Sequence, residues 1–161
     1  MGVVEARVVV DVPPDLAFAV SQTQPPVRLR WDPFVRSQRL VGTDTPGKGV
    51  RTLTRHRLGL GMESEYVSYS PPRAVGMKMI TGPWFFARFG GGWRFADGPE
   101  PGTTEAVWRY NFAIRPAWLA PLADPIGRLV LGRDIRRRIA GFARGCRDEV
   151  VLAAARDTLT P

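Results

Sequence analysis

Apolar and polar residues alternate through most of the chain, and a helical period replaces the alternation in only a few segments. Every second residue from Val4 to Val10 is apolar, which predicts a half-buried strand. Six further strands follow between about residue 35 and Ile114, separated by turns rich in proline and glycine. The last and most regular strand has one mostly apolar face, which is made of Thr104, Ala106, Trp108, Tyr110, Phe112 and Ile114.

Two short helices are expected after the first strand. The segment from Asp15 to Gln22 has helical character and stops before Pro25 and Pro26, and a second short helix covers residues 26–31. The run from Gly90 to Gly92 marks either a bulge or a close approach of two backbones in the sixth strand. A bulge there would reverse the sides on which Trp93 and Phe95 lie.

The stretch from Pro116 to Asp157 has a helical period. As one helix it would be about 60 Å long, whereas a compact chain of this size is about 40 Å across. Its apolar residues form two stripes that point in nearly opposite directions, and the change falls near Gly132. We therefore expect a break there, with the second segment, about 133–156, held against the sheet. The first stripe comprises Leu119, Leu122, Ile126, Leu129 and Val130, and the second Leu131, Ile135, Ile139, Phe142, Cys146 and Ala153.

This order of elements predicts an α+β fold in which a curved antiparallel sheet wraps around one long C-terminal helix. A cavity is expected between the two, and this points to a protein that holds a small molecule. The chain has 161 residues, 44% of them hydrophobic and 24% charged, so we expect a single domain over residues 1–161 with a sizeable core. No run of 18 apolar residues is present, and the N-terminus lacks the pattern of a secretory signal.

Cysteine content and charge bear on the location of the protein in the cell and on its binding partners. With Cys146 as the only cysteine, no internal disulfide can form, and we expect a cytoplasmic protein. The net charge is +8, and all basic residues except Lys48 and Lys78 are arginines. Because the arginines are spread along the chain, composition bias explains them better than nucleic-acid or membrane binding does. The one cluster is Arg133, Arg136, Arg137 and Arg138.

Several short motifs occur in an order that resembles the START-like (SRPBCC, helix-grip) superfamily, in particular its polyketide cyclase/dehydrase family. The matching segments are residues 11–15 (DVPPD), 31–35 (WDPFV), 47–49 (GKG) and 69–73 (YSPPR), Thr104 at the start of the last strand, and the long terminal helix. The resemblance implies a helix-grip fold, with a seven-stranded antiparallel sheet, two small helices at one end and a long helix across the concave face. It also implies ligands such as lipids, polyketides and other hydrophobic molecules. These motifs belong to the scaffold, so they carry the fold and not an activity.

Alternation along the strands and the helix stripe predict which side chains line the cavity. Aromatic residues form one wall, methionines suit an adaptable pocket, and the second helix stripe closes it. The predicted ligand-binding residues are Val50, Thr52, Thr54, Met77, Met79, Trp93, Trp108, Phe112, Ile139, Phe142 and Cys146. Glu63 and Glu65 share one face of a strand, and we expect that face to be solvated, with Met62, Ser64 and Tyr66 towards the cavity.

Four residues are candidates for proton transfer if the protein is an enzyme. His56 is the only histidine and shares a face with Thr52 and Thr54, and its ordinary pKa suits acid–base work. The other candidates are Tyr66, Tyr110 and Arg138, the last of which is suited to a ligand carboxylate or enolate. Cys146 lies among apolar residues of the helix and is expected to be inert.

One histidine and one cysteine do not make a usual zinc site, so we expect no metal, and no motif calls for a cofactor. Three functions remain open. The first is binding of a small hydrophobic molecule by a monomer or homodimer, which needs no catalytic residue. The second is a polyketide cyclase, aromatase or dehydratase that uses the same cavity. The third is nucleic-acid or membrane-surface binding through the arginine-rich helix.

Overall fold

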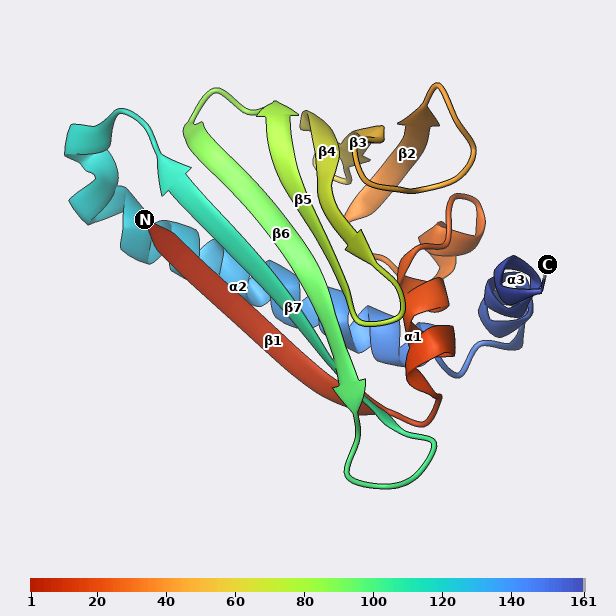
Figure 1. The fold of residues 1–161 in the computed structure, drawn as a ribbon. Helices are drawn as coiled ribbons and strands as arrows, with labels where there is room; N and C mark the ends of the chain where they lie inside the picture. The colour runs from red at the N-terminus through yellow and green to blue at the C-terminus, as the bar shows by residue number, and fades with distance from the viewer. Residues whose placement is uncertain (161) are drawn as a thin grey trace.

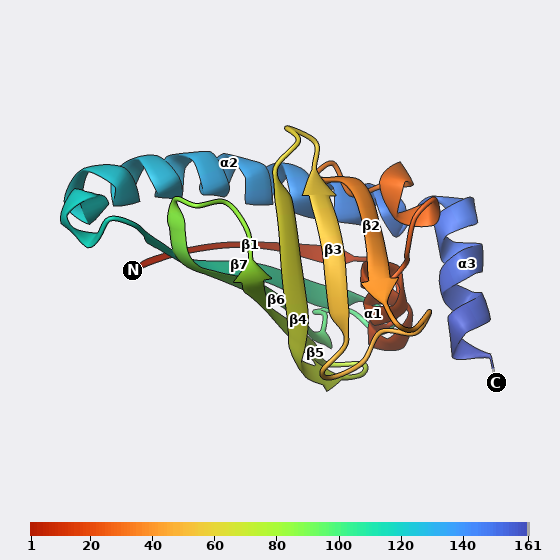
Figure 2. The ribbon, with the colours of Figure 1, turned by 90° about the horizontal axis from the view of Figure 1, so that it is seen from above.

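All seven strands form one antiparallel sheet in the order β1-β7-β6-β5-β4-β3-β2 in the computed structural model, which describes residues 1–160. The sheet curves around a long helix that runs along the concave side behind β1 and β7 (Figures 1 and 2). The expected fold is therefore confirmed. The strands are β1 (Gly2–Val10), β2 (Val35–Val41), β3 (Arg51–His56), β4 (Gly61–Ser70), β5 (Ala74–Thr81), β6 (Phe86–Asp97) and β7 (Thr104–Ile114).

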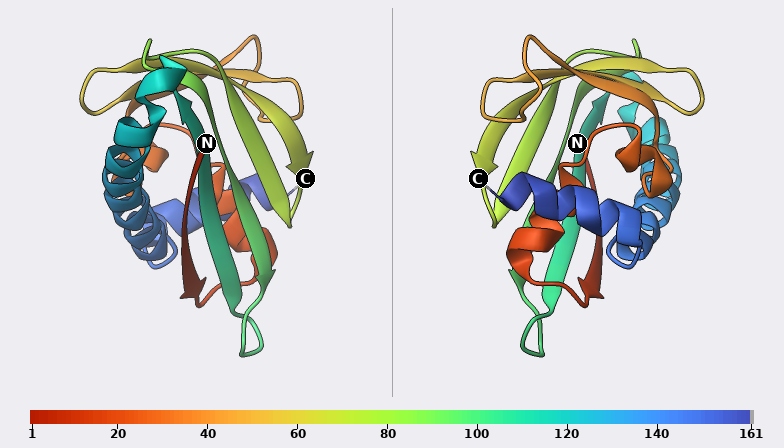
Figure 3. Two further views of the ribbon diagram at one scale, coloured as in Figure 1. Left: turned by 90° about the vertical axis from the view of Figure 1, so that its left-hand side faces the viewer. Right: turned by 90° about the vertical axis from the view of Figure 1, so that its right-hand side faces the viewer.

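Helices cover one end and the concave side of this sheet. Both short helices expected after the first strand are present, as α1 (Pro14–Ser21) and the 3-10 helix η1 (Val27–Arg30). A second 3-10 helix, η2 (Ala117–Leu119), leads into the long helix α2 (Ala120–Gly145). The final helix α3 (Glu149–Leu159) packs against α1, away from the centre of the sheet (Figure 3).

The long helix does not break at Gly132, so that prediction is wrong. Instead α2 continues to Gly145, and the chain turns at Cys146 and Arg147. The Asp148 side chain then begins α3 by accepting hydrogen bonds from the backbone N–H groups of Val150 (2.9 Å) and Val151 (3.3 Å). A glycine in a helix is a weak point but does not oblige the helix to stop, whereas a side chain that caps a new N-terminus defines one.

Two glycines near the end of α2 let it approach the segment after η1. A methyl group at Gly141 would overlap the carbonyl oxygen of Trp31, and one at Gly145 would meet the Trp31 ring. Trp31 is itself buried, and its ring packs edge-on to Phe142 at a centroid distance of 5.7 Å. This close packing fixes α2 relative to the segment that carries Asp32.

The glycines at 90–92 mark a close backbone approach and not a bulge. Their partners continue in regular register, from Gly90 opposite Asn111 to Gly92 opposite Arg109, and the irregularity lies earlier, between Phe86 and Arg88. Trp93 therefore stays on the concave side, directly opposite Trp108, and both rings are buried.

Candidate functional site

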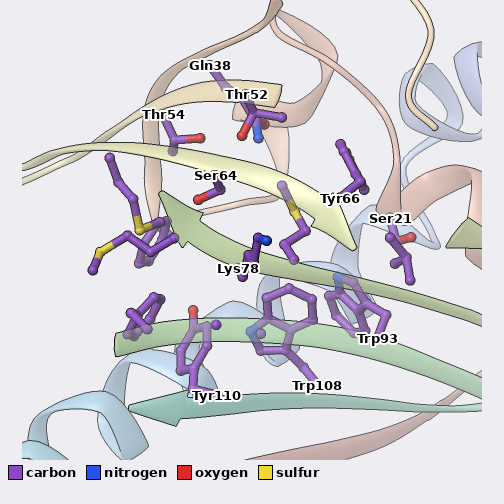
Figure 4. A pocket seen from close by; sticks show the side chains of 18 of the residues that line it. Ser21, Gln38, Thr52, Thr54, Ser64, Tyr66, Lys78, Trp93, Trp108 and Tyr110 are labelled. Carbon is purple, nitrogen blue, oxygen red and sulfur yellow. The ribbon is translucent and has the colours of Figure 1, made fainter. Parts of the chain in front are cut away.

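The concave side of the sheet holds a small cavity of about 50 Å³, lined by both polar and apolar side chains. Figure 4 shows it between two walls: Thr52, Thr54 and Ser64 face Trp108 and Tyr110 across it. These positions follow from the alternation of the strands, because every second residue of β3, β4 and β7 points inward. A volume of this size holds a few water molecules or one small oxygen-bearing group.

Polar atoms without a partner surround this cavity. Among the described residues, four side-chain atoms that line it are buried and make no hydrogen bond: Gln38 Oε1, Thr52 Oγ1, Trp93 Nε1 and Trp108 Nε1. Trp108 lies close enough to Tyr110 to influence its pKa, but its indole N–H lacks good hydrogen-bond geometry. Buried polar atoms are costly when unpaired, so this cavity suits water or a ligand oxygen better than an apolar group.

A buried ion-pair cluster lies beside this cavity. Asp32 Oδ2 accepts hydrogen bonds from Arg138 Nη2 (2.8 Å), Arg138 Nε (3.2 Å) and Arg28 Nε (2.9 Å). Arg28 also donates to the Ser21 carbonyl oxygen (2.9 Å), and Arg28 and Asp32 are four residues apart. Two arginines share one carboxylate, so this cluster carries a net positive charge inside the protein.

Opposing effects act on the ionisation of these groups. Burial alone would raise the pKa of Asp32, but the two arginines outweigh it and the pKa is lowered. Burial acts to lower the pKa of both guanidinium groups. At Arg138 burial is outweighed by the charge of Asp32 and by the interaction with Tyr110, so its pKa is raised. At Arg28 burial prevails, and its pKa is lowered. Both side chains remain cations at neutral pH because arginine starts from so high a pKa.

From this cluster a polar chain continues towards the surface. Arg138 Nη1 donates to the Tyr110 hydroxyl (3.0 Å), and that hydroxyl lies 3.5 Å from Asp134 Oδ2. Asp134 Oδ1 in turn lies 3.9 Å from His56 Nε2. Asp134 and Arg138 are one turn apart on α2, so both point at β7. Burial, above all, raises the pKa of Tyr110, which therefore stays protonated at neutral pH.

His56 is oriented by its own hairpin. Its Nδ1 accepts a hydrogen bond from the Leu58 backbone N–H (3.1 Å), and its ring packs edge-on to Phe34 at 4.5 Å. Burial lowers its pKa despite the neighbouring Asp134, so the neutral form prevails at pH 7. In that form the Nε2 atom carries the proton and faces Asp134, and Nδ1, the acceptor nitrogen, is already bonded to the Leu58 backbone N–H.

A larger apolar groove adjoins the polar chain. It has a volume of about 710 Å³, which is within the range of ligand pockets, and lies between α2 and the loops that follow β3 and β5. Phe34, Thr54, Met62 and Phe89 line both this groove and the inner cavity, so they form the partition between them. His56 and Asp134 line the groove, and its apolar walls include Leu58, Leu60, Phe85, Phe86, Leu129, Val130 and Leu131.

The structure separates the predicted site residues into three groups. Thr52, Thr54, Met77, Met79, Trp93 and Trp108 line the inner cavity, as do the catalytic candidates Tyr66, Tyr110 and Arg138. His56 and Thr54 line the groove. Five predicted ligand contacts line neither space: Val50, Phe112, Ile139, Phe142 and Cys146. All but Val50 are buried, and Phe112 and Phe142 are packed among other rings.

Sequence reasoning missed several residues of this site. Asp32 and Arg28 form the buried cluster, and Asp134 links it to His56. The spacing of four residues was a usable signal in both pairs, because it brings side chains together on a helix, as for Asp134 and Arg138, or across one turn, as for Arg28 and Asp32 at the end of η1. Nothing in the pattern indicated the groove phenylalanines Phe85, Phe86 and Phe89. Glu63 and Glu65 lie on the outer face as expected, near Arg51 at 3.2 and 3.9 Å.

Over residues 1–160, no three side chains of the metal-binding types come together. None of the helices described here is both long and apolar enough to cross a membrane.

Comparison with known proteins agrees with this geometry. The sequence profile described as "polyketide cyclase / dehydrase and lipid transport" matches residues 1–147. No curated protein sequence matches significantly.

Solved structures share the fold at low identity. The Zhui aromatase/cyclase from Streptomyces sp. R1128 superposes with a TM-score of 0.74 at 17% identity, over 92% of this chain and 94% of that one. A START superfamily protein from Mycobacterium smegmatis gives 0.69 at 9% identity, over 89% and 98%. Major latex-like protein 151 from Panax ginseng gives 0.63 at 14% identity, over 86% and 94%. Such likenesses establish the fold and leave the activity to the residues of this chain.

Proposed function

Because this chain belongs to the polyketide cyclase/dehydrase and lipid transport family, with a START-like fold, we propose that it binds one small hydrophobic molecule in the groove beside α2. The observation that carries the proposal is the 710 Å³ groove, whose apolar walls lead directly to a short polar chain. An apolar pocket with a few convergent polar groups is the usual form of a small-molecule site. The body of the ligand would contact Phe85, Phe86 and Leu131.

The polar chain specifies which end of the ligand lies inward. Asp134 and His56 line the groove, and the Tyr110 hydroxyl and the Arg138 guanidinium lie behind Phe34 and Phe89. A carbonyl or hydroxyl oxygen at this depth would find a protonated tyrosine and a cation, both fixed by hydrogen bonds. The ligand is therefore expected to carry an oxygen function at one end of an apolar body.

Native mass spectrometry of the protein purified from its own host would identify a bound molecule directly. Binding can also be measured with 1-anilinonaphthalene-8-sulfonate, an apolar anionic fluorophore. The variant Phe85→Asp puts a negative charge into the groove, which repels the sulfonate, and should abolish its binding. Val67→Asp, on the outer face of β4, is a matched control and should retain it. Equal affinity in both variants would mean that the groove is not the binding site.

A second function, catalysis by a polyketide cyclase, aromatase or dehydratase, is favoured by one specific observation. A carboxylate, Asp134, lies 3.5 Å from the hydroxyl of Tyr110, which itself accepts a hydrogen bond from Arg138. In a reaction that begins at a carbon next to a carbonyl, Asp134 would remove the proton. Tyr110 and Arg138 would then stabilise the enolate oxygen that forms.

His56 fits a supporting role better than that of the base. Its acceptor nitrogen is engaged by the Leu58 backbone, and its Nε2 faces Asp134. A linear poly-β-ketone thioester would test this second function, with cyclised product measured for the wild type and for Tyr110→Phe. Loss of turnover with unchanged binding in the variant would support catalysis. Turnover equal to the uncatalysed rate in the wild type would leave binding as the function.

A further inference from the structure

The continuity of α2 leaves one apolar stripe without a partner inside the protein. We name it the helix patch: Trp118 of η2 with Leu122, Ile126, Leu129 and Val130 of α2, each between 59% and 79% exposed. A break at Gly132 would have turned this stripe towards the sheet. Since α2 runs straight through that position, the buried face with Ile135 and Phe142 belongs to its second half, and the helix patch faces solvent.

The helix patch has the geometry of one amphipathic surface. At 100° per residue, its four members on α2 lie within about 100° of the helix circumference. Two further exposed apolar side chains come from neighbouring loops, Trp84 before β6 and Leu58 in the β3–β4 hairpin, and each is 76% exposed. That hairpin and α2 project on the same side of the molecule (Figures 2 and 3). Single exposed apolar residues are ordinary, but a contiguous group of this size marks an interaction surface.

Arginines flank the helix patch. Arg133, Arg136 and Arg137 continue along the same side of α2, Arg57 lies in the adjacent hairpin, and all four are exposed. Within the part of the chain that the structure describes, none of them takes part in a salt bridge, whereas the nearby Asp124 lies 3.5 Å from the terminal amino group. The surface therefore combines apolar side chains with uncompensated positive charge.

We propose that this surface docks the protein onto an anionic lipid bilayer, with the helix patch in the headgroup region and the arginines against the phosphates. Tryptophan prefers the membrane interface, and an amphipathic helix with arginines beside its apolar face is the usual means of peripheral binding. Each arginine near an anionic bilayer contributes affinity. Leu129, Val130, Arg133, Arg136 and Arg137 also line the groove, so the groove opens beside the docking surface. The proposal does not depend on what the groove binds.

Two other partners fit the surface less well. A two-fold interface with a second copy would cover the helix patch, but it would bring a second set of the same positive charges to the interface and no anionic group to match them. The phosphates of nucleic acid would match the positive charge of the arginines, but nucleic acid offers no apolar layer for Trp118, Leu122 and Ile126. An anionic bilayer matches both the apolar and the charged residues.

Vesicle flotation tests the proposal, with vesicles of pure phosphatidylcholine and vesicles in which roughly one third of the lipid is phosphatidylglycerol. The wild type should float with the anionic vesicles and release as salt is added. The double variant Leu122→Ser/Ile126→Ser should bind at least about tenfold more weakly, because its apolar side chains no longer enter the interface. The double variant Arg136→Gln/Arg137→Gln should bind roughly 20-fold more weakly.

A matched control separates the docking surface from overall charge. Arg55→Gln/Arg94→Gln removes the same net charge from the outer face of the sheet, where both residues are exposed. Its binding should stay within about threefold of the wild type. All altered residues are exposed, and thermal unfolding followed by circular dichroism would verify that the fold is kept.

Absence of wild-type binding to the anionic vesicles would overturn the proposal, and so would equal binding by the wild type and the Leu122→Ser/Ile126→Ser variant. Sedimentation equilibrium would identify the alternative partner. A wild-type dimer that this variant converts to a monomer, without any vesicle binding, would assign the surface to a second copy of the chain.

Discussion

Replacing Asp32 by asparagine should destabilise the protein strongly, because the substitution leaves two buried arginines without a counter-charge. Three hydrogen bonds from guanidinium groups, of 2.8, 2.9 and 3.2 Å, converge on one oxygen of Asp32, whose side chain is fully buried. In Asp32→Asn, Arg28 keeps its bond to the Ser21 carbonyl and Arg138 keeps its bond to Tyr110. The net charge inside the cluster, however, rises by one unit.

Removing one partner of a buried ion pair typically costs about 3–5 kcal/mol. Since a domain of this size is stable by roughly 5–15 kcal/mol, we expect urea denaturation to show a large loss in the free energy of unfolding. Asp97→Asn is the matched control. Its carboxylate pairs with Arg73 at 3.4 Å on the surface, with 77% of the side chain exposed, and its loss should cost no more than about 0.5 kcal/mol.

The pH dependence of the same variant gives a second measurement. The pKa of Asp32 is lowered in the folded protein, so its stabilising contribution is complete above the pKa it has in the unfolded chain. The contribution is lost progressively as the pH falls from that value to the lowered, folded pKa. The difference in unfolding free energy between wild type and Asp32→Asn should therefore stay constant from neutral to mildly acidic pH and narrow only in strong acid. A loss below about 1 kcal/mol at neutral pH would refute the argument, because it would mean that solvent or another group neutralises the arginines.

Two further predictions concern packing around the end of α2. Gly141→Ala should lower the free energy of unfolding by about 1–3 kcal/mol, because its methyl group overlaps the Trp31 carbonyl oxygen. Gly132→Ala should instead raise the free energy of unfolding by up to about 1 kcal/mol, as alanine usually does in a helix, because the nearest neighbour of its methyl group would be an Arg136 nitrogen at 3.6 Å. Chemical denaturation of both variants measures the two effects, and equal effects would contradict the prediction. Burial raises the pKa of the Cys146 thiol to about 12. Ellman's reagent should therefore fail to label the native protein at neutral pH and should label it fully in denaturant. Rapid labelling of the native protein would show instead that the thiol is accessible.

The strands and their inward faces follow from alternation because a pleated strand has a fixed period of two. Thr104, Ala106, Trp108, Tyr110 and Phe112 are predicted on one face, and all five are buried. The helix-grip arrangement follows from the order of the elements and from the resemblance to START-like proteins, and the family comparison agrees with it.

Periodicity in the C-terminal helix shows which residues share a side, but it does not show which side meets the protein. Both stripes around Gly132 are apolar, and the break was predicted there because the two stripes point in nearly opposite directions. The structure keeps α2 straight and buries only the second stripe, so Leu122 and Ile126 are left exposed. The sequence alone carries no sign of this difference, because it depends on how far the sheet extends along the helix.

Cavity volumes are harder still to predict from the sequence. Trp93, Trp108 and Phe142 are inward-facing residues, as expected for a ligand wall, but their rings contact one another at 4.6 Å and fill the space between sheet and helix. The interior therefore closes down to about 50 Å³, and the larger space lies at the end of the sheet beside the middle of α2. Packing of large side chains decides this outcome, and a pattern of apolar positions does not encode it.

Arg138 combines two roles that mutagenesis at that position cannot separate. Its guanidinium ties α2 to Asp32, stacks at 4.6 Å on both Phe34 and Trp108, and donates to the Tyr110 hydroxyl. A neutral replacement would remove structural contacts together with the cation offered to a ligand, and lysine would keep the charge without the stacking or the forked hydrogen bonds. Tyr110→Phe removes only the hydroxyl and leaves the Arg138–Asp32 pair in place, at a cost of about 1–2 kcal/mol for the two hydrogen bonds lost, with Arg138 and Asp134. A loss of ligand affinity or turnover in that variant, larger than its modest effect on stability, would therefore be due to the hydroxyl that lines the inner cavity behind the groove.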